Sequence, residues 1–302
     1  MLSLGFDIGG TTVKAGVLDE DYKLIVKESR QTPKHDAEAL CDMIAEMAKE
    51  LSGGAELLRC VGVTVPGSVD KDGGIIDAWN LGLRNVPLKR MIEQRVRAKR
   101  VIVKNDADAA ADAELHFGAL RGVRCGMMLT LGTGVGGSII LDGKLFHGGQ
   151  DRGTELGHAM IARGGELCAC GHRGCIETLC SATALKKLAI KACSEEKGMI
   201  YALYQNGHEP DAKLLIDCAL QGDEYALELF EQYTDVLSDA IASFVNVLDP
   251  ETIVIGGGVS GAGDFLIERL RVKVPPRTFF GSCGTILKAG AGNDAGILGA
   301  II

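Results

Sequence analysis

Short apolar runs alternate along the chain with longer stretches in which apolar positions recur at helical spacing. Residues 36–51 have such spacing, and Asp36 stands at the position of an N-cap. The other elements expected in the first third are a strand ending in a glycine turn at 2–10, two strands joined at Asp19–Asp21 within 12–31, a buried strand at 59–67 and a short helix at 85–96.

The same alternation continues through the rest of the chain. A strand at 99–106 runs directly into an alanine-rich helix at 107–120, and the most suitable domain boundary is this junction near Asn105. Further elements are expected as follows: strand, glycine turn, strand, tight turn and short strand at 125–146; helices within 181–248; a strand at 251–261 leading to a helix at 264–273; and a short apolar helix at 293–302.

Composition and charge exclude several classes of protein. The 302 residues, 46% of them hydrophobic, suffice for one large domain or two ordinary ones. A formal charge of −8 argues against broad nucleic-acid binding, which needs a basic surface. We see no secretion signal and no apolar run near the length of about 18 residues that predicts a membrane span. We therefore expect a cytoplasmic protein whose ten cysteines are mostly reduced.

Three glycine turns follow predicted strands. In the first, DIGGTTVK at 7–14, backbone amides and the Thr11 and Thr12 hydroxyls can cradle phosphate, and Asp7 can hold Mg²⁺ through water. A plain hairpin turn is the alternative. The second, at 131–140, has the glycine spacing of a dinucleotide fingerprint but continues as a strand, so we reject that interpretation. The third, at 255–263, precedes a helix and is weak evidence for an adenosine pocket.

Residues 157–180, GHAMIARGGELCACGHRGCIETLC, contain four of the ten cysteines and two of the six histidines. Cys168, Cys170 and Cys175 offer three thiolates within eight residues, which predicts a zinc site lacking one ligand. From spacing alone, His158, His172 and Cys180 all compete for the fourth position. The cysteines elsewhere in the chain are expected to be buried apolar residues: Cys41, Cys60, Cys125, Cys193, Cys218 and Cys283.

Taken together, these motifs resemble the ROK family of sugar kinases and repressors. The resemblance is carried by DIGGTTVKAG, NDADAAA, LGTGVGGSIILDGKLFHGG, ELGH, CACGHRGCIE and GNDAGILGA, in that order. It implies an α/β, actin-like ATPase and sugar kinase fold whose two α/β domains enclose ATP in an interdomain cleft. The first domain is expected at 1–105, completed by a C-terminal helix at about 290–302, and the second, with the zinc loop and helical segment, at 106–289.

The resemblance also assigns roles at the sugar. Asp106 aligns with the family's catalytic base, although an aspartate at this strand-to-helix junction is equally suited to N-capping, and the two roles are compatible. Trp79 is expected to pack near the cleft, and Asp108 to be a helix-start charge. The implied sugar contacts are Asn80, Asn105, Asp106, Glu155, His158 and Glu177.

For the nucleotide and metals, the resemblance implies ATP, Mg²⁺ and a structural Zn²⁺. His158 becomes the expected fourth zinc ligand, beside Cys168, Cys170 and Cys175, while His172 is expected in the loop and Cys180 as a small apolar group. The expected ATP contacts lie in the three glycine turns: Asp7, Gly9, Gly10, Thr11, Thr12, Lys14, Gly132, Thr133, Gly134, Gly136, Gly137, Gly257 and Gly258.

The expected function is an ATP-dependent hexose kinase that converts glucose to glucose 6-phosphate. Fructose, allose, N-acetylmannosamine and N-acetylglucosamine are alternative substrates, because the sequence does not place the pocket wall that discriminates hydroxyls. A sugar-sensing transcriptional regulator is disfavoured, since the first phosphate turn begins at Asp7 and leaves no room before it for a DNA-reading module. The expected partners are sugar and ATP, not nucleic acid or membrane, and the resemblance suggests a homodimer or homotetramer.

Overall fold

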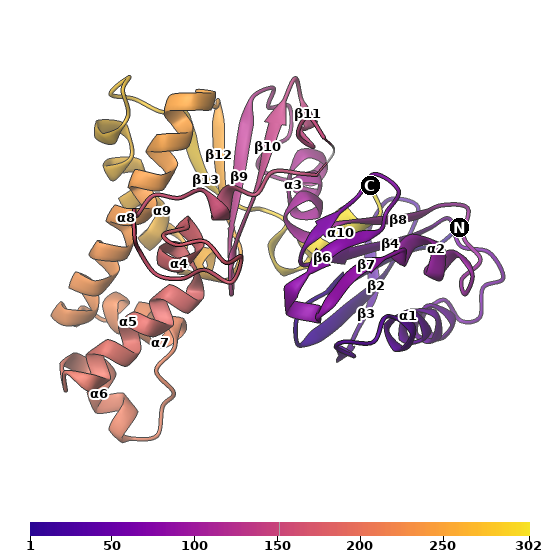
Figure 1. The fold of residues 1–302 in the computed structure, drawn as a ribbon, viewed down its shortest axis with the longest axis horizontal. Coiled ribbons are helices and arrows are strands. Elements are labelled where there is room, and N and C mark those ends of the chain that lie inside the picture. Colours follow the sequence, from indigo (N-terminus) through magenta and orange to yellow (C-terminus); the bar gives the residue numbers. More distant parts are fainter. Residues whose placement is uncertain (151) are drawn as a thin grey trace. The chain divides into compact units, whose positions relative to one another are not determined.

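The computed structural model describes residues 1–150 and 152–302, which divide into two compact units (Figure 1). Unit 1 comprises Met1–Arg121, Leu145–Thr154 and Gly290–Ile302, and unit 2 comprises Gly122–Lys144 and Glu155–Ala289. Each unit is built around a five-stranded sheet. No helix in the described part of the chain is both long and apolar enough to cross a membrane.

The sheet of unit 1 has the strand order β3-β2-β1-β4-β8. Its strands β1, β2 and β3 form an antiparallel meander, whereas β1, β4 and β8 are parallel. All six residues of β4 are buried, as expected for a central parallel strand. The bounds are β1 Ser3–Ile8, β2 Thr12–Leu18, β3 Leu24–Gln31, β4 Cys60–Val65 and β8 Val101–Asn105.

Helices α1, α2, α3 and α10 accompany this sheet, with a small antiparallel sheet of β5, β6 and β7. Asp36 caps α1 by accepting a hydrogen bond from Ala39 N, which confirms the predicted cap. The bounds are α1 Ala37–Leu51, β5 Ser68–Val69, β6 Ile75–Ala78, the 3₁₀ turn η1 Trp79–Leu81, β7 Leu83–Val86, α2 Leu88–Glu93, α3 Asp106–Phe117, η5 Gly292–Asp294 and α10 Ala295–Ala300.

Glycines allow α10 to approach the sheet of unit 1 at backbone distance. A Cβ atom at Gly5 in β1 would lie 2.1 Å from the carbonyl oxygen of Ile297, and one at Gly62 in β4 would lie 2.0 Å from that of Ala300. On the other side, a Cβ atom at Gly299 would lie 1.7 Å from the carbonyl oxygen of Ala109 in α3. The C-terminal helix is therefore packed tightly between the sheet and α3.

The sheet of unit 2 has the order β11-β10-β9-β12-β13 and repeats the pattern of unit 1. Strands β9 and β10 are antiparallel, whereas β9, β12 and β13 are parallel. The bounds are β9 Gly126–Leu131, β10 Val135–Leu141, β11 Lys144–Leu145, β12 Thr252–Gly256 and β13 Thr285–Lys288.

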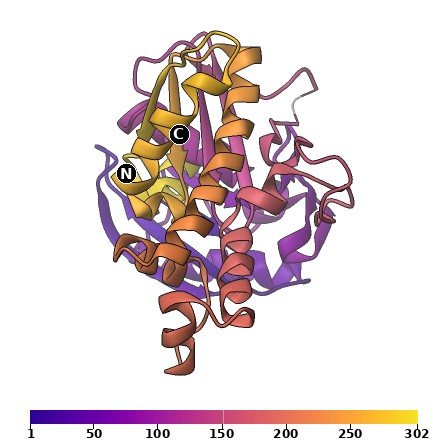
Figure 2. The same ribbon diagram turned by 90° about the vertical axis from the view of Figure 1, so that its left-hand side faces the viewer.

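The helices of unit 2 lie against its sheet (Figure 2). They share one hydrophobic core with the sheet, and Phe230 and Tyr233 of the long helix α8 are buried in it. The bounds are η2 Leu156–His158, α4 Ile176–Cys180, α5 Ala182–Ser194, α6 Gly198–Gln205, α7 Ala212–Leu220, α8 Glu224–Leu248, η3 Gly258–Ala262, α9 Asp264–Lys273 and η4 Pro275–Arg277.

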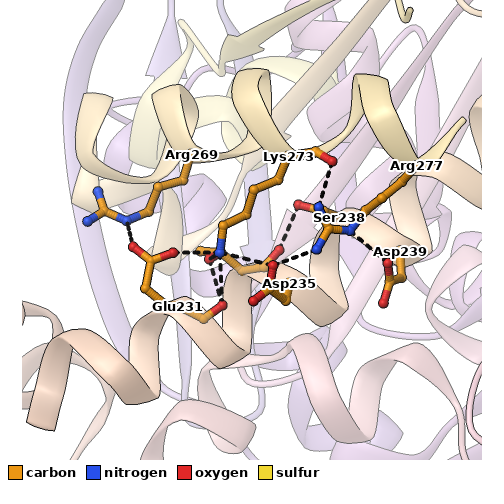
Figure 3. A network of polar contacts seen from close by, with 8 residues as sticks. Glu231, Asp235, Ser238, Asp239, Arg269, Lys273 and Arg277 are labelled. Atoms are coloured by element: carbon orange, nitrogen blue, oxygen red, sulfur yellow. Dashed lines mark hydrogen bonds and ion pairs between the residues drawn. The ribbon is translucent and has the colours of Figure 1, made fainter. Parts of the chain in front are cut away.

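A ladder of ion pairs joins α8 to α9 and η4 (Figure 3). Arg269 Nε lies 2.6 Å from a carboxylate oxygen of Glu231, and Lys273 Nζ lies 2.5 Å from the other oxygen and 3.1 Å from Asp235. Arg277 continues the ladder to Asp235 and Asp239, at 2.6 and 2.9 Å. Because several charges share partners, this network stabilises the helix pair more than isolated surface pairs would.

The structure corrects the predicted domain boundary. Helix α3 follows residue 105 but belongs to unit 1, because it packs against α10, and the segment Leu145–Thr154 also belongs there. The sequence also missed four short strands, β5, β6, β7 and β13, which lack a run of apolar residues long enough to stand out. All the strands and helices that were predicted from the sequence are present in the structure.

Candidate active site and metal centre

The carboxyl ends of the three parallel strands in unit 1 bring together the acidic candidates. In the register of the sheet, Asp7 of β1 lies opposite Thr64 of β4, and Val65 of β4 lies opposite Asn105 of β8. Thr64 donates a hydrogen bond from Oγ1 to Asp7 Oδ1 at 3.0 Å, and Lys14 Nζ lies 3.9 Å from Asp7 Oδ2. The parallel order thus sets Asp7 and the β8–α3 junction two strands apart, about 10 Å, at one edge.

The first glycine turn is a tight hairpin at this edge. Gly9 N donates to the carbonyl of Thr12 at 2.9 Å, and Thr32 Oγ1 donates to the carbonyl of Gly9 at 2.7 Å. The side chains of Thr11 and Thr12 are exposed. The turn therefore has the geometry of a hairpin, which was the alternative to a phosphate site. It also presents exposed hydroxyls that could contact phosphate, so the two interpretations are compatible.

Asn80 of η1 lies beside this turn. A Cβ atom at Gly10 would lie 3.5 Å from Cβ of Asn80. Asn80, a predicted sugar contact, therefore lies next to Gly10, a predicted phosphate contact. Trp79, in contrast, is 68% exposed in the structure, so the expectation that it is packed is not met in unit 1.

At the β8–α3 junction the structure corrects the proposed capping role of Asp106. The N-cap is Asn105, whose Oδ1 accepts from Ala107 N at 2.8 Å and from Asp108 N at 3.1 Å. Asn105 Nδ2 also donates to the carbonyl of Gly67 at 3.0 Å. Asp106 is the first helical residue and stays partly exposed, with Oδ1 accepting from Ala107 N at 2.9 Å. Asn105 thus holds the junction rigidly and leaves the carboxylate of Asp106 accessible.

Asp108 lies in the first turn of α3, as expected for a helix-start charge, but its side chain is buried. Its Oδ2 lies 3.6 Å from Nδ1 of His147, and a Cβ atom at Gly153 would lie 3.6 Å from the same oxygen. Hydrogen bonding to Asp108 raises the pKa of His147 above its ordinary value of 6.5, which favours the ion pair. His147 and Gly153 are themselves joined by a backbone hydrogen bond of 2.8 Å. Asp108 therefore ties the segment before Glu155 to α3.

In unit 2, the two remaining glycine turns meet at the carboxyl ends of the parallel strands β9 and β12. Gly257, with φ of 79°, lies against β9 so closely that a Cβ atom would be 2.5 Å from Leu131 N. Gly132 N donates to the carbonyl of Gly134 at 3.0 Å, which closes the turn after β9. Ligands of open α/β sheets bind at such carboxyl edges.

Four side chains converge in the loop between η2 and α4. The ligand atoms of His158, Cys168, Cys170 and Cys175 all lie within 4.8 Å of one another. Cys168 Sγ lies 3.6 Å from His158 Nδ1, and Cys170 Sγ lies 3.7 Å from Cys175 Sγ. In tetrahedral zinc sites with Zn–S bonds of about 2.3 Å, two thiolates lie about 3.8 Å apart, so this donor set fits zinc.

The rivals for the fourth ligand differ in their surroundings. His172 is exposed and its Nδ1 lies 3.6 Å from Cys170 Sγ, but it is not part of the four-residue group. Cys180 is buried on α4, and burial raises the pKa of its thiol to about 12, as expected for an apolar role. Of the six cysteines expected to be buried elsewhere, Cys41, Cys60 and Cys218 are buried, whereas Cys125, Cys193 and Cys283 are only partly so.

The thiols of the cluster are electrostatically unequal. Burial raises the pKa of Cys168 to about 12. Burial also acts to raise the pKa of Cys170, but hydrogen bonds from His172, Cys168 and Cys175 outweigh it and lower the pKa to about 7. A bound metal ion would keep all three as thiolates.

Glu177 connects the cluster to the glycine turn after β9. Its Oε2 accepts a hydrogen bond from Val135 N at 3.0 Å, while Cys168 Sγ donates to Oε1 at 3.3 Å. On the other side of the cluster, Glu155 Oε2 lies 4.0 Å from Nε2 of His158, which leaves Nδ1 of the ring facing Cys168. Glu155, His158 and Glu177 are therefore assembled around one loop.

Several contacts at these sites were missed from the sequence. The roles of Thr64, Asp108 and His147 depend on strand register and on a loop returning to α3, which no local pattern reveals. The hydrogen bond from Val135 to Glu177 uses the backbone amide of Val135, which no residue type in the sequence indicates.

Comparison with known proteins identifies the family. The family model described as "ROK family" matches residues 3–302. The chain belongs to the ROK family. Among its relatives, a protein from Thermotoga maritima named glucokinase is 38% identical over 98% of this chain and 95% of its own length. One from Halalkalibacterium halodurans, also named glucokinase, is 38% identical over 98% of this chain and 92% of its own length.

Solved structures of the ROK family have the same fold. A ROK family glucokinase from Streptomyces griseus, in complex with glucose and AMPPNP, matches with a TM-score of 0.87 and 32% identity over 100% of this chain and 98% of its own. The ROK chain described here accordingly has the actin-like ATPase and sugar kinase fold that its motifs predicted.

Proposed function

We propose that the protein is an ATP-dependent hexose kinase that phosphorylates glucose to glucose 6-phosphate. The observation that carries this proposal is the carboxyl edge of the sheet in unit 1. There Asp106 is held by the Asn105 cap, and Asp7 lies two strands away beside a glycine turn. A base and a phosphate clamp at one sheet edge are the two requirements of phosphoryl transfer. The relatives named glucokinase support the choice of sugar.

In the proposed reaction, the carboxylate of Asp106 accepts the proton of the sugar 6-hydroxyl. The hydroxyl oxygen then forms a bond to the γ-phosphorus of ATP, and the bond from that phosphorus to the β,γ-bridging oxygen breaks, releasing ADP. Asp106 suits this role because its carboxylate is partly exposed while its backbone is fixed by the Asn105 cap. Asn105 and Asn80 are proposed to orient the sugar.

The glycine turns are proposed to hold the nucleotide. Unit 1 supplies the turn at 9–12, where the Thr11 and Thr12 hydroxyls are exposed, and unit 2 supplies the turns at 132–137 and 257–258. Asp7 fits Mg²⁺, because its carboxylate is partly exposed beside the phosphate turn. Such an ion would neutralise charge on the phosphates.

Glu155, His158 and Glu177 are proposed to bind sugar hydroxyls, and His158 with Cys168, Cys170 and Cys175 would hold a structural zinc ion. Four protein ligands leave zinc no open position, so we assign it no chemical step. By binding a ring nitrogen of His158 and the cysteines of the loop that leads into Glu177, the metal would help to fix the orientation of these side chains.

We further propose that the protein acts in the cytoplasm as a homodimer or homotetramer. The ten free cysteines fit a reducing compartment. Size-exclusion chromatography with light scattering measures the number of subunits.

A coupled assay of ADP release tests the function. The purified protein is given Mg-ATP and, in turn, glucose, fructose, mannose, allose, N-acetylmannosamine and N-acetylglucosamine. We expect the highest kcat/KM with glucose. A higher kcat/KM with another hexose would assign the kinase to that sugar instead, and the absence of sugar-dependent ADP release would overturn the kinase itself.

A further inference from the structure

A pocket of about 480 Å³ lies in unit 1 at the opposite end of β8 from Asp106. It opens between α2, the loop that follows it and the start of β8. Its walls are formed by Leu57, Lys89, Glu93, Val96, Arg97, Ala98, Lys99, Arg100 and Val101. Because β8 rises about 3.3 Å per residue, Val101 and Asn105 are about 13 Å apart, so this pocket is separate from the candidate catalytic edge.

The pocket is basic in a chain that is acidic overall. Four lining side chains are cationic and only Glu93 is anionic, which gives a net charge of +3, whereas the whole chain has a formal charge of −8. Segregated charge of one sign in a concave site concentrates counter-ions. The charge of the pocket is therefore opposite in sign to that of the whole chain, and it favours an anionic ligand.

Most of these cationic side chains form no ion pair with a described carboxylate of the protein. In residues 1–150 and 152–302, no carboxylate oxygen lies within 4.0 Å of the side-chain nitrogens of Lys89, Arg97 or Lys99. Arg100 is the exception, because its Nη2 donates to the backbone oxygens of Ile301 and Ile302, at 2.7 and 3.1 Å. Three positive side chains thus line the pocket without a direct ion pair to a described carboxylate.

The frame of the pocket is ordered by main-chain hydrogen bonds. Leu58 N donates to the carbonyl of Arg97 at 3.0 Å, and Lys99 N donates to the carbonyl of Leu58 at 3.0 Å. Val61 N donates to the carbonyl of Arg100 at 2.9 Å. The loop that carries Arg97 and Lys99 is consequently held by an isolated parallel bridge between Ala98 and Leu58, just before β4, so both cations extend from a hydrogen-bonded backbone.

From these observations we infer that the pocket binds a small phosphate ester. A guanidinium and two ammonium groups match the charge and the acceptor oxygens of a phosphate dianion. The apolar walls formed by Leu57, Val96 and Ala98 accommodate an organic body, and the volume falls within the range of about 300–1,000 Å³ typical of ligand sites. This inference does not rest on the proposed function.

Isothermal titration calorimetry with two probes, glucose 6-phosphate and inorganic phosphate, tests the site. The comparison is between the wild type, the pocket variant R97Q/K99Q and the control K23Q/K49Q, which loses the same charge from exposed positions of unit 1. We expect the wild type and the control to bind glucose 6-phosphate alike, and the pocket variant to bind it at least tenfold more weakly or with one site fewer per chain.

The outcomes separate the possible ligands. Stronger binding of glucose 6-phosphate than of inorganic phosphate supports a phosphate ester as ligand, whereas equal binding supports the same anion site but assigns it to free phosphate. Equal titrations of the pocket variant and the wild type, or no binding of either probe, would overturn the proposal. Circular dichroism melts of all three proteins establish that they are folded, and the ADP-release assay, run separately, reports on the kinase function.

Discussion

At the scale of single residues, the junction between β8 and α3 shows how the N-cap role passes from one side chain to its neighbour. An aspartate at the start of a helix usually satisfies backbone amides itself. Here Asn105 accepts from two of them, so the carboxylate of Asp106 is not consumed as the N-cap. The end of β8, the N-cap of α3 and the proposed catalytic base thereby occupy two consecutive residues, Asn105 and Asp106.

Replacing Asp106 by asparagine tests its role as the base. Asp106→Asn is nearly isosteric, so fold and sugar affinity are expected to persist, while kcat falls by about 10²–10⁴-fold because general-base catalysis is lost. Steady-state kinetics with glucose, together with calorimetry of glucose binding, measures both effects. The control is Asp142→Asn, at a side chain that is 90% exposed in unit 2. A variant with the wild-type kcat would remove Asp106 from the mechanism.

Gly134 offers a second test at residue scale. A Cβ atom there would lie 2.2 Å from Oε2 of Glu177, so Gly134→Ala should displace the carboxylate and break its hydrogen bond to Val135 N. The loss of a hydrogen bond to a charged group costs about 1.5–3 kcal/mol. We expect a lower melting temperature for Gly134→Ala, whereas Gly132→Ala, where no atom lies within 4 Å of the added Cβ, should change it far less. Equal melting temperatures would contradict the contact.

At the scale of elements, the loop between η2 and α4 joins the candidate metal ligands and proposed sugar contacts in one short segment. Its backbone folds back on itself, since Cys168 N donates to the carbonyl of His172 and Ile161 N donates to that of Gly174. At Gly174, with φ of 79°, a Cβ atom would lie 1.7 Å from the carbonyl oxygen of Ala162. Only glycine permits this approach, which closes the loop around the four ligands.

The loop predicts a clear pattern of metal content. Elemental analysis of the wild type should find close to one zinc per chain. Cys170→Ala and His158→Ala should lose most of the metal and the sugar phosphorylation, whereas His172→Ala should retain the metal, because this histidine lies outside the four-residue group. Nucleotide binding by the glycine turns is expected to survive in Cys170→Ala. A fully active wild type without metal, or zinc loss in His172→Ala alone, would contradict the assignment.

The sequence predicted elements better than it predicted their contacts. Apolar runs and caps located β1, α1 and β8 because their signals are local, and the spacing of Cys168, Cys170 and Cys175 pointed to their convergence. The membership of α3 in unit 1 could not be predicted, since it depends on packing against α10, far away in the chain. The ion pair of Asp108 with His147 was not predicted either, because it also joins residues that are distant in the chain.

At the scale of the whole molecule, the two sheets share one plan. Each places an antiparallel hairpin beside parallel strands, in the orders β3-β2-β1-β4-β8 and β11-β10-β9-β12-β13. In both units, a glycine turn joins the two strands of the antiparallel hairpin: residues 9–11 between β1 and β2, and residues 132–134 between β9 and β10. The phosphate-binding candidates thus occupy equivalent positions in the two units.

Unit 1 also depends on the C-terminal helix, which gives a prediction for the whole chain. Gly299→Ala should force α10 away from α3, because its Cβ atom would lie 1.7 Å from the carbonyl oxygen of Ala109. Overpacking of this kind costs about 1–3 kcal/mol or more. We expect faster amide hydrogen exchange in β1 and β4 and unchanged exchange in β9 and β12. Gly261→Ala in unit 2, where no atom is within 4 Å of the added Cβ, is the control, and equal exchange in both variants would contradict the prediction.

The same dependence has a consequence during protein synthesis. The ribosome adds about 5–20 residues per second, so about 10–50 seconds separate the synthesis of β4 from that of α10. All of unit 2 is translated in that interval, while β1 and β4 still lack the α10 residues that cover Gly5 and Gly62. Until α10 has been synthesised, the nascent chain therefore holds an unfinished first unit whose apolar surface is open to chaperones.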